Sequence, residues 1–425
     1  MPTPIRALTV ADVHRFVDEQ VFPTTATDGS NGSDGSDGSD GPAGRQVGIE
    51  LEWITVTRDG TRDGRGANPE ELRALLPDLP GHSRLTFEPG GQLELSGPPA
   101  AGLGAALAAM RADTATVRDA LADAGIDLVG AGIDTRGDRT RLLQAPRYSA
   151  MEEYFDTAWP AGRTMMRNTA SIQVNLDIGA PDEVEARWSR AHDLGPVLTA
   201  CFANSPFDAG GRPSGFRSTR AAVWQAIDPA RTSSARRHDP ESAARGDWAR
   251  YVLDAPVMMI CVDDAHSVAV RSPQSFEQWI VDGHPLGWPT LDDLAYHVTT
   301  LFPPVRPRGW LELRMIDALP EEWWPVAVAI TVALLDDPLA AEWATSAVAP
   351  ARDRWSTAAR EALHDPALGE AARWCFDAAL LALERVGADP VTIDAAEEYA
   401  ERFVRRYRCP ADDLLDDWAG HPANV

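Results

Sequence analysis

Val47-Gly48-Ile49-Glu50-Leu51-Glu52-Trp53 is the stretch of sequence that decides the fold. Apolar and acidic residues alternate in it, which is the pattern of a half-buried β-strand. The carboxylates of Glu50 and Glu52 therefore share the polar face, on Cα atoms roughly 6.5–7 Å apart. Two carboxylates this close repel each other unless one is protonated or a cation binds them. An isolated pair of this kind most simply marks the hydrated face of a sheet.

The same alternation recurs in three later segments, 84–96, 169–178 and 310–316. Segment 84–96 is typical of two strands joined by a Pro-Gly-Gly turn. If all these strands pair in one sheet, their apolar faces pack on helices and their polar faces form one floor. The side chains on that floor would be Glu50 and Glu52; Glu88, Gln92 and Glu94; Ser171, Gln173, Asn175 and Asp177; and Glu312 and Arg314, with Met315 on the apolar side.

A floor with many glutamates and few cations repels itself, which favours bound divalent ions over a face that is merely hydrated. Oxygen ligands select Mg²⁺ or Mn²⁺ rather than zinc. Metal ions beside an arginine are what transfer of a nucleotide phosphoryl group requires, and Arg314 would stabilise the charge on that group. Considered alone with Glu312, Arg314 would more simply form a salt bridge.

The composition excludes several classes of protein. With 39 basic and 64 acidic residues the net charge is −25, which argues against general nucleic-acid binding. Lysine is absent, which excludes a Walker A loop and a lysine Schiff base. The four cysteines show no C-x-x-C spacing, so neither a zinc site nor a disulfide framework is expected. No signal peptide is evident, and the longest apolar run, 325–335, is too short to cross a bilayer. We expect a cytoplasmic protein that binds no membrane.

The chain divides into four predicted parts. Residues 1–27 contain an amphipathic helix over 9–22, and residues 28–44 form a low-complexity Asp-Gly-Ser tract that predicts a flexible loop. Residues 45–320 hold the catalytic sheet region, with a long loop predicted over 208–241. Residues 321–425 are predicted to be helical and to pack on the same domain, since no break in composition sets them apart. The helices predicted there span 321–335, 340–347, 352–364, 370–386 and 393–407.

Six linked motifs, in one order between about residues 47 and 320, closely resemble the plant and bacterial glutamate–cysteine ligases. They are Val47-Gly-Ile-Glu-Leu-Glu-Trp; Phe87-Glu-Pro-Gly-Gly-Gln-Leu-Glu-Leu-Ser-Gly; Met165-Met-Arg-Asn-Thr-Ala-Ser-Ile-Gln-Val-Asn-Leu-Asp; Ala203-Asn-Ser-Pro-Phe; Ser218-Thr-Arg-Ala-Ala-Val-Trp followed by Asp228-Pro-Ala-Arg-Thr; and Thr299-Thr-Leu-Phe-Pro-Pro-Val-Arg with Trp310-Leu-Glu-Leu-Arg. The last third matches only loosely. The lysine-free, Arg-, Ala- and Asp-rich composition is typical of a high-GC actinobacterial chain, and in that group the similar enzyme opens the ergothioneine pathway.

The resemblance implies an α+β fold with a glutamine-synthetase-like, curved, mainly antiparallel catalytic sheet backed by helices, and a helical C-terminal third. It also implies a reaction in which ATP and Mg²⁺ (or Mn²⁺) join the γ-carboxyl of L-glutamate to the amine of L-cysteine, through γ-glutamyl phosphate. The chemistry agrees, because a carboxylate does not acylate an amine in water until ATP activates it. Metal ions let the γ-carboxylate and the triphosphate, both anions, approach each other.

The resemblance also assigns residue roles. The implied metal ligands are Glu50, Glu52, Glu94 and Glu312, with Glu88 and Gln173 as further candidates. Arg314 is the implied catalytic contact of the γ-phosphate, and Arg167 is a second nucleotide contact. Arg220 is the implied clamp for the glutamate α-carboxylate. The other substrate-binding candidates are Asn204, Trp224, Arg231 and Tyr251; Arg231 could equally hold its loop, and the two aromatic side chains could equally pack in the core.

Other functions remain open at this point. The chain could be a related carboxylate–amine ligase with a different amine, a phosphagen-type kinase, a two-metal hydrolase or an inactive nucleotide-binding module. Arg220 and the Asn204-Ser-Pro-Phe motif favour the amino-acid ligase, because a hydrolase needs no carboxylate clamp. The sequence does not identify a base for the amine, nor the oligomeric state.

Overall fold

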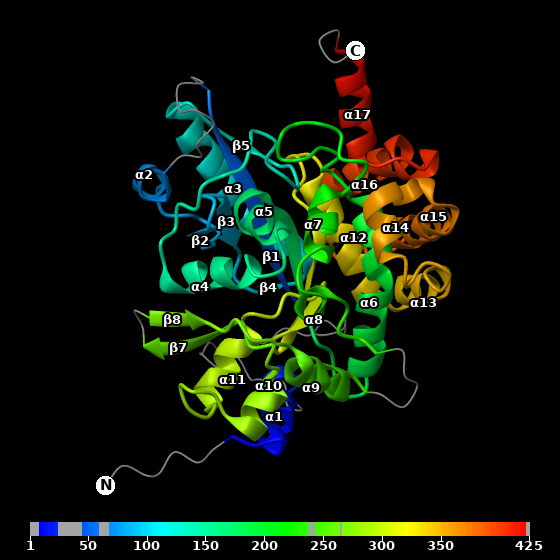
Figure 1. The fold of residues 1–425 in the computed structure, drawn as a ribbon. Helices are drawn as coiled ribbons and strands as arrows, with labels where there is room; N and C mark the ends of the chain where they lie inside the picture. Colours follow the sequence, from blue (N-terminus) through cyan, green and yellow to red (C-terminus); the bar gives the residue numbers. More distant parts are fainter. Residues whose placement is uncertain (1–7, 24–44, 59–67, 238–242, 264–265, 422–425) are drawn as a thin grey trace.

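A single antiparallel sheet forms the centre of the computed structural model, which describes residues 8–23, 45–58, 68–237, 243–263 and 266–421 (Figure 1). The strand order is β2-β3-β1-β6-β10-β9, and β4 and β5 also pair with β1. The eight strands are β1 (Gln46–Thr57), β2 (Arg84–Phe87), β3 (Leu93–Ser96), β4 (Ala100–Ala101), β5 (Ile126–Val129), β6 (Ser171–Asp177), β9 (Val305–Pro307) and β10 (Trp310–Asp317). The tract 28–44, predicted to be a loop, lies outside the described residues.

The pairing register brings the alternating segments together as the sequence predicts. On β1, Glu52 lies directly opposite Glu94 of β3, and Glu50 lies opposite Gln173 of β6. On β10, Glu312 lies opposite Asn175 of β6. Carboxylates directly opposite each other across two strands destabilise a sheet. The sheet therefore carries an electrostatic penalty at its centre that a bound cation or the protonation of a carboxylate relieves.

The two-residue period of the strands is interrupted at two places. The β10–β6 register shifts between Leu313 and Ile316, and beside this irregularity Met315 lines a cavity together with Arg314. Gln92 precedes β3, and its amide donates to the Thr169 carbonyl at 2.8 Å instead of joining the polar floor. The prediction for Gln92 was wrong because the turn before β3 interrupts the two-residue period, whereas Met315 is buried in the apolar core with Leu311 and Leu313, as predicted.

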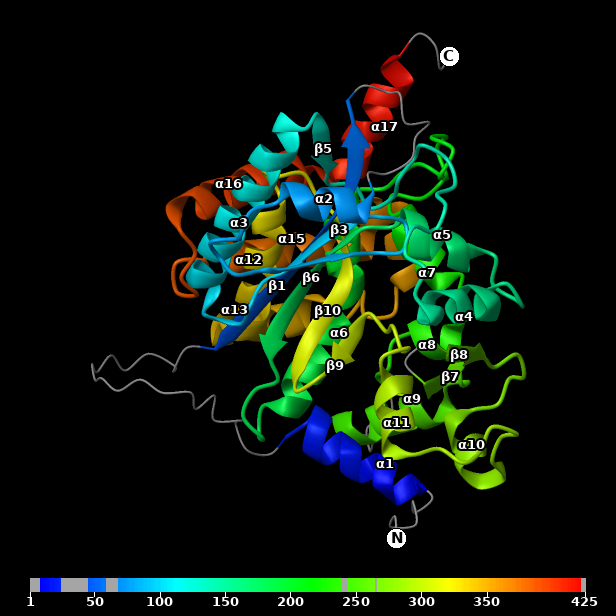
Figure 2. The same ribbon diagram turned by 90° about the vertical axis from the view of Figure 1, so that its left-hand side faces the viewer.

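Helices cover both faces of the sheet (Figure 2). On one face α3 (Leu103–Asp123), α6 (Val184–Cys201) and α12 (Trp324–Asp336) contact β1, β10 and β6. On the other lie α4 (Pro146–Phe155), α5 (Ala161–Asn168) and α7 (Thr219–Gln225). The second group buries its own apolar cluster, which includes Met151, Met165 and Met166. Space therefore remains between this cluster and the polar face of the sheet.

The segment 208–241 was predicted to be largely loop, and most of its described part is loop, but two short helices that were not predicted, α7 (Thr219–Gln225) and α8 (Pro229–Thr232), interrupt it. Ser218 caps α7 by accepting from the Ala221 amide, and Asp228 caps α8 by accepting from the Ala230 amide. These are favourable helix starts. Helices this short show no apolar period in the sequence, which is why they were missed.

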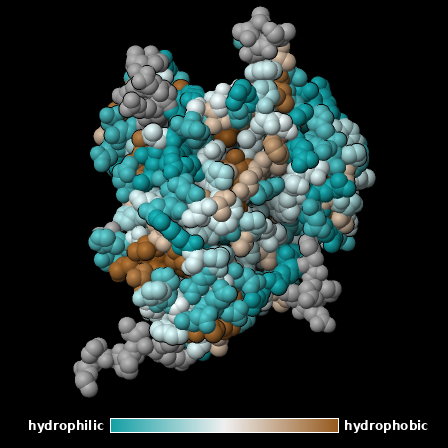
Figure 3. Space-filling view, viewed as in Figure 1, coloured by the Kyte–Doolittle hydropathy of each residue, from teal (hydrophilic) through white to brown (hydrophobic). Residues whose placement is uncertain are grey.

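A smaller lobe includes the N-terminal helix α1 (Val10–Phe16). Thr9 caps this helix, which continues as a π-helical turn, Val17–Val21. Helix α1 packs on α9 (Ala244–Asp254). The same lobe holds α10 (Phe276–Asp282), α11 (Leu291–Val298) and the hairpin of β7 (Met259–Asp263) and β8 (His266–Ala269). An apolar surface lies over this hairpin, where Val262 and Val268 are exposed (Figure 3).

The C-terminal third is helical, as predicted. After α12 come α13 (Pro338–Ala347), α14 (Trp355–Glu361), α15 (Pro366–Leu380), α16 (Pro390–Arg402) and α17 (Pro410–Gly420), with 3₁₀ turns at Ala362–His364 and Val404–Arg406; α2 (Pro69–Leu75) lies earlier in the chain. One core cluster contains both Leu51 of the sheet and Val328 of α12, so we infer that residues 321–425 fold with the sheet region. In the described part of the chain no single helix could cross a membrane; α12 and α13 could do so only as a pair, and they are bent by 95°.

Candidate active site

A cavity of about 230 Å³ lies over the polar face of the sheet; we call it the acidic cavity. Pro89, Met151, Met165 and Met166 supply its apolar lining. Glutamates and arginines supply most of the rest. Among the residues predicted from the sequence, the cavity gathers Glu50, Glu52, Glu88, Glu94, Gln173, Arg220, Trp224, Glu312 and Arg314.

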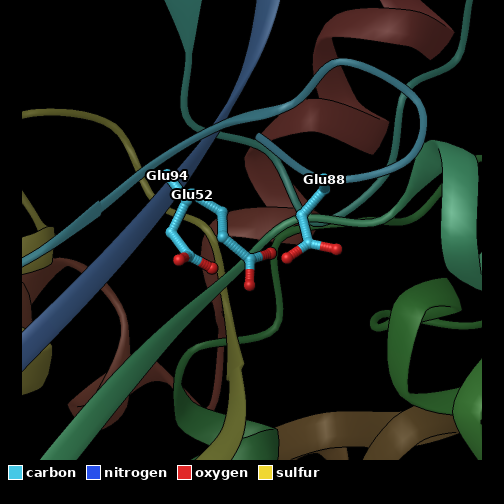
Figure 4. Close-up of side chains that lie close together, drawn as sticks. All are labelled: Glu52, Glu88 and Glu94. Atoms are coloured by element: carbon cyan, nitrogen blue, oxygen red, sulfur yellow. The ribbon is translucent and has the colours of Figure 1, made fainter. Parts of the chain in front are cut away.

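Three carboxylates come closest together, and we call Glu52, Glu88 and Glu94 the carboxylate trio. One oxygen from each lies within 4.8 Å of the others (Figure 4). Glu52 comes from β1 and Glu94 from β3, whereas Glu88 follows β2 at the Pro-Gly-Gly turn. The turn therefore folds back a third carboxylate over the two that the strands place opposite each other.

Neighbouring donors orient two members of the trio. Glu52 accepts from the Ser171 amide at 2.8 Å, the Ser171 hydroxyl at 3.0 Å and the Gln173 amide at 3.1 Å. Glu94 accepts from the Thr86 hydroxyl at 2.5 Å and the Ser96 hydroxyl at 3.1 Å. These are neutral donors, so they direct the carboxylates without balancing their charge.

Arginines line the acidic cavity too, but among the described residues none forms an ion pair with Glu50 or with the carboxylate trio, so the negative charge at this end is not balanced by a close cation. Burial, together with repulsion from Glu312 and Glu94, raises the pKa of Glu50 from 4.5 to about 7. Burial and Glu94 raise the pKa of Glu52, and burial, Glu94 and Glu52 raise that of Glu88 well above its usual range. An all-oxygen trio, in which Glu52 is buried and Glu88 and Glu94 are partly exposed, fits a hard divalent cation such as Mg²⁺ when its charge is not otherwise balanced.

This imbalance predicts how pH affects stability. Between about pH 5 and 7 Glu50 holds its proton in the folded state, with a pKa of about 7, but loses it in the unfolded chain. The folded state then binds more protons, so the free energy of unfolding should fall as pH rises through this window. Mg²⁺ should oppose that fall, because it binds the ionised carboxylates. Melting curves from about pH 5 to 8, with and without Mg²⁺, measure both effects. The same dependence of the melting temperature on pH with and without Mg²⁺ would contradict the expected role of the cation.

Glu312 lies at the other end of the cavity, among arginines. Its carboxylate contacts Arg306 at 2.5 and 3.0 Å, Arg314 at 3.3 Å and Arg308 at 3.7 Å. Burial alone would raise the pKa of Glu312, but Arg306 and Arg314 outweigh it and lower the pKa to about 2. Its charge is therefore already balanced, in contrast to the carboxylate trio.

Gln173 links the two ends of the cavity. Its side-chain oxygen accepts from Arg314 at 2.6 Å, and its amide nitrogen donates to Glu52. The structure thus places Gln173 and Glu312 in contact with Arg314 and outside the trio, which weakens both as predicted metal ligands. Gln173 instead holds Arg314 beside the carboxylates.

Several cavity residues had no role in the sequence interpretation. They are Arg147 and Tyr148 of α4, and Arg306 and Arg308 of the β9–β10 hairpin. Arg306 could have been found: the run Val305-Arg-Pro-Arg-Gly before the strand at Trp310 is a hairpin signal that puts Arg306 opposite Glu312. Arg147 and Tyr148 lie on α4, a helix that was not predicted from the sequence.

Arg220 and Trp224 of α7 separate the acidic cavity from a second cavity of about 260 Å³. Arg220 donates to the Arg314 carbonyl at 2.8 Å and lies 3.8 Å from Asp317. The Nε of Arg220 and the Nε1 of Trp224 are buried and have no hydrogen-bond partner among the described residues. Two such donors between two cavities require an acceptor, and a ligand carboxylate would supply it.

Four predicted site residues lie outside the described lining of both cavities. Asn204 donates to the carbonyls of Gly130 and Ala318, and so braces a loop. Tyr251 stacks on Trp248 and donates to the Ser233 carbonyl at 3.2 Å. Both side chains make internal contacts and line neither cavity, which favours a structural role over substrate binding.

The two arginines of this group are held in ion pairs. Arg167 pairs with Glu152 and does not reach the acidic cavity, so we no longer assign it to the nucleotide. Arg231 is fully buried; it pairs with Asp228 at 2.5 Å and donates to Thr300 and to the Pro256 carbonyl. Of the two roles open for Arg231, the structure favours holding its loop.

Arg231→Leu is expected to lower the free energy of unfolding by about 3–5 kcal/mol, because it leaves the buried Asp228 without its cation. The variant that does fold should keep its KM for each substrate within a few-fold of the wild type. Urea unfolding measures the first effect and steady-state kinetics the second. Unchanged stability with a raised substrate KM would restore the binding role.

Comparison with known proteins shows the family of this chain. The model of glutamate-cysteine ligase family 2 (GCS2) matches residues 46–423. The chain is 44% identical over 387 residues to the glutamate–cysteine ligase EgtA of Mycobacterium tuberculosis, covering 88% of this chain and 86% of that protein. The EgtA of Mycolicibacterium smegmatis is also 44% identical, with 88% and 87% covered.

A solved structure shows the same fold. A bifunctional glutathione synthetase from Pasteurella multocida superposes with a TM-score of 0.50 at 16% sequence identity. The match covers 90% of this chain and 51% of that protein, so this chain spans about half of it. The α+β architecture expected from the sequence, an antiparallel catalytic sheet backed by helices, is confirmed. From the family model and these relatives, the chain belongs to glutamate-cysteine ligase family 2.

Proposed function

We propose that the protein catalyses the ATP-dependent joining of the L-glutamate γ-carboxyl to the L-cysteine amine, giving γ-glutamylcysteine, ADP and phosphate. The observation that carries this proposal is the acidic cavity itself. It places an unbalanced carboxylate trio beside Arg314 and Arg220, in a chain of this family. Activation of a carboxylate by ATP needs both a metal site, which the trio would supply, and fixed positive charge, which the arginines supply.

The trio supplies the metal end of the reaction. Glu52, Glu88 and Glu94 would hold Mg²⁺, or Mn²⁺, and Glu50 adds a fourth carboxylate to the same cavity. When bound, the ion neutralises phosphate oxygens so that the γ-carboxylate and the triphosphate can meet. Ser171 and Gln173 keep Glu52 aimed at this position throughout.

The arginines supply the fixed positive charge. Arg314 lies between Glu312 and Gln173, so its guanidinium is held at the cavity wall before substrate arrives. Such preorganised charge stabilises a phosphoryl group in transfer more than a mobile side chain would. Arg306 neutralises Glu312 and so leaves Arg314 free to act on the phosphate.

Arg220 and Trp224 bind the donor amino acid in this proposal. Their unpartnered Nε and Nε1 atoms, both buried, would donate to the α-carboxylate of glutamate. From there the γ-carboxylate reaches toward Arg314, whose carbonyl already binds Arg220. The activated carbon then lies where the two cavities meet, and the amine can attack it.

Release of ADP by the purified protein with Mg²⁺ and ATP tests the function. We expect strong release only when glutamate and cysteine are both present. Hydroxylamine in place of cysteine should trap the acyl phosphate as γ-glutamyl hydroxamate. Release with ATP alone would indicate a hydrolase, and strong release with glutamate and a different amine would indicate a related ligase.

Two further assignments follow the sequence resemblance. We propose that the γ-glutamylcysteine feeds ergothioneine synthesis, a role supported by the similarity to two proteins named EgtA. Deletion of the gene should then lower cellular ergothioneine, and added γ-glutamylcysteine should restore it. The cytoplasmic location stays a prediction, which cell fractionation checks.

A further inference from the structure

The second cavity borders the acidic cavity, and Arg220, Trp224, Phe302 and Arg314 line both. Its remaining lining is mixed: Pro303, Met315 and Trp355 are apolar, serine and threonine side chains contribute hydroxyl groups, and Asp353 contributes a carboxylate. It holds none of the carboxylate trio. Its chemistry therefore suits an uncharged side chain, not a triphosphate.

When the triphosphate, its cation and glutamate fill the acidic cavity, the second cavity is the space left for the amine. In the proposed function the triphosphate and its cation occupy the carboxylate end, and the glutamate chain runs from Arg220 toward Arg314. The amine must approach the activated carbon from a side that none of these groups fills. The second cavity is the lined space that opens at this boundary.

Trp355 forms a wall of the second cavity and comes from the C-terminal third, at the start of α14. Its backbone carbonyl accepts from the side chain of Gln225 on α7 at 3.1 Å. Its ring lies over α6 at Gly195, where an added Cβ would fall 1.9 Å from the ring atom Cη2. Glycine is therefore the only residue type at position 195 that leaves the indole of Trp355 in place, since every other side chain begins with this Cβ atom.

We infer that the second cavity receives the amine acceptor and that Trp355, seated on Gly195, sets the size of the acceptor side chain. The inference rests on the proposed ligase function and adds to it a residue that determines specificity. A polarisable thiol on a single methylene is compatible with a lining of indole, thioether and proline. A longer acceptor side chain would clash with the indole of Trp355.

Trp355→Ala tests this directly. The KM for cysteine should rise about tenfold or more, because a hydrophobic contact of this kind is worth at least that much. The KM values for glutamate and ATP should stay within two-fold. Discrimination against L-norleucine, whose side chain is longer, should fall by about tenfold in kcat/KM. Trp355→Phe should lie between the wild type and the alanine variant.

Gly195→Ala provides a second route that removes no lining atom. The added methyl group must displace the indole. The same selective rise in the cysteine KM is expected, even if Trp355→Ala folds poorly. Trp374→Ala is the matched control, since Trp374 is 57% exposed on α15 and lines neither cavity.

Two results would overturn the inference: an unchanged cysteine KM and norleucine discrimination in the folded Trp355→Ala and Gly195→Ala variants, or a rise in the glutamate KM instead. Failure of the ligase function is separate, because it would show in the wild type. If the wild type used a different amine, the same variants compared with that amine would still decide the role of Trp355.

Discussion

Glu52→Ala is expected to lower kcat at least about 10³-fold, which corresponds to about 4 kcal/mol of lost transition-state stabilisation. Glu52 is the member of the carboxylate trio that three hydrogen bonds orient. The substitution therefore removes the two oxygen ligands of the cation site that are held most firmly in position. Steady-state ADP release at saturating Mg²⁺ measures the effect. Calorimetric titration with Mg²⁺ should show weakened binding in the same variant.

The fold of this variant should survive. Removing Glu52 relieves its repulsion with Glu94 directly across the strand pair, so melting without cation should not drop steeply. Glu342→Ala, which removes an exposed glutamate on α13, is the matched control and should behave as wild type. Activity within tenfold of wild type would remove Glu52 from the metal site.

Arg314→Gln is expected to lower kcat by about 10²–10³-fold, the loss typical of removing one preorganised donor from a transition state. The KM for ATP should change less, because the contact strengthens as charge develops during transfer. Formation of γ-glutamyl hydroxamate should fall by the same factor as ADP release, since both need the phosphorylation step. Rapid-quench measurement of that step checks the assignment.

Arg308→Gln gives the comparison for Arg314. Arg308 also faces Glu312, but at 3.7 Å and with its side chain 45% exposed, so its variant should lose far less activity. Equal losses in the two variants would mean that general positive charge, and not the position of Arg314, serves the reaction.

Much of the site could be predicted from the sequence, because a strand alternates its faces over a few residues. Glu50 and Glu52 had to share one face, and the acidic habit of the later strands made a common floor the simplest arrangement. Glu88, placed just across the predicted turn, and Trp224, which rested on resemblance, also line the acidic cavity. The short helices α7 and α8 escaped prediction because seven and four residues hold too little periodicity.

One physical cause explains why predicted site residues lie outside both cavities. Arg231 and Asn204 belong to runs that resemble the family, yet they donate to backbone carbonyls that folding brings to them. Sequence separations of 25 to 114 residues lie between these partners. A motif shows that a residue type is required at a position, but it does not show whether its hydrogen-bond donors bind a substrate or another part of the protein.

The sequence by itself determined the acidic sheet face and its need for cations, because alternation and charge are properties of neighbouring residues. Only the tertiary structure decided which arginines balance Glu312, why Glu50, Glu52 and Glu88 remain unbalanced, and that Trp355 of the C-terminal third closes the second cavity. Those features depend on distances between side chains far apart in the chain, and only the packing of the sheet, α6, α7 and α14 sets those distances.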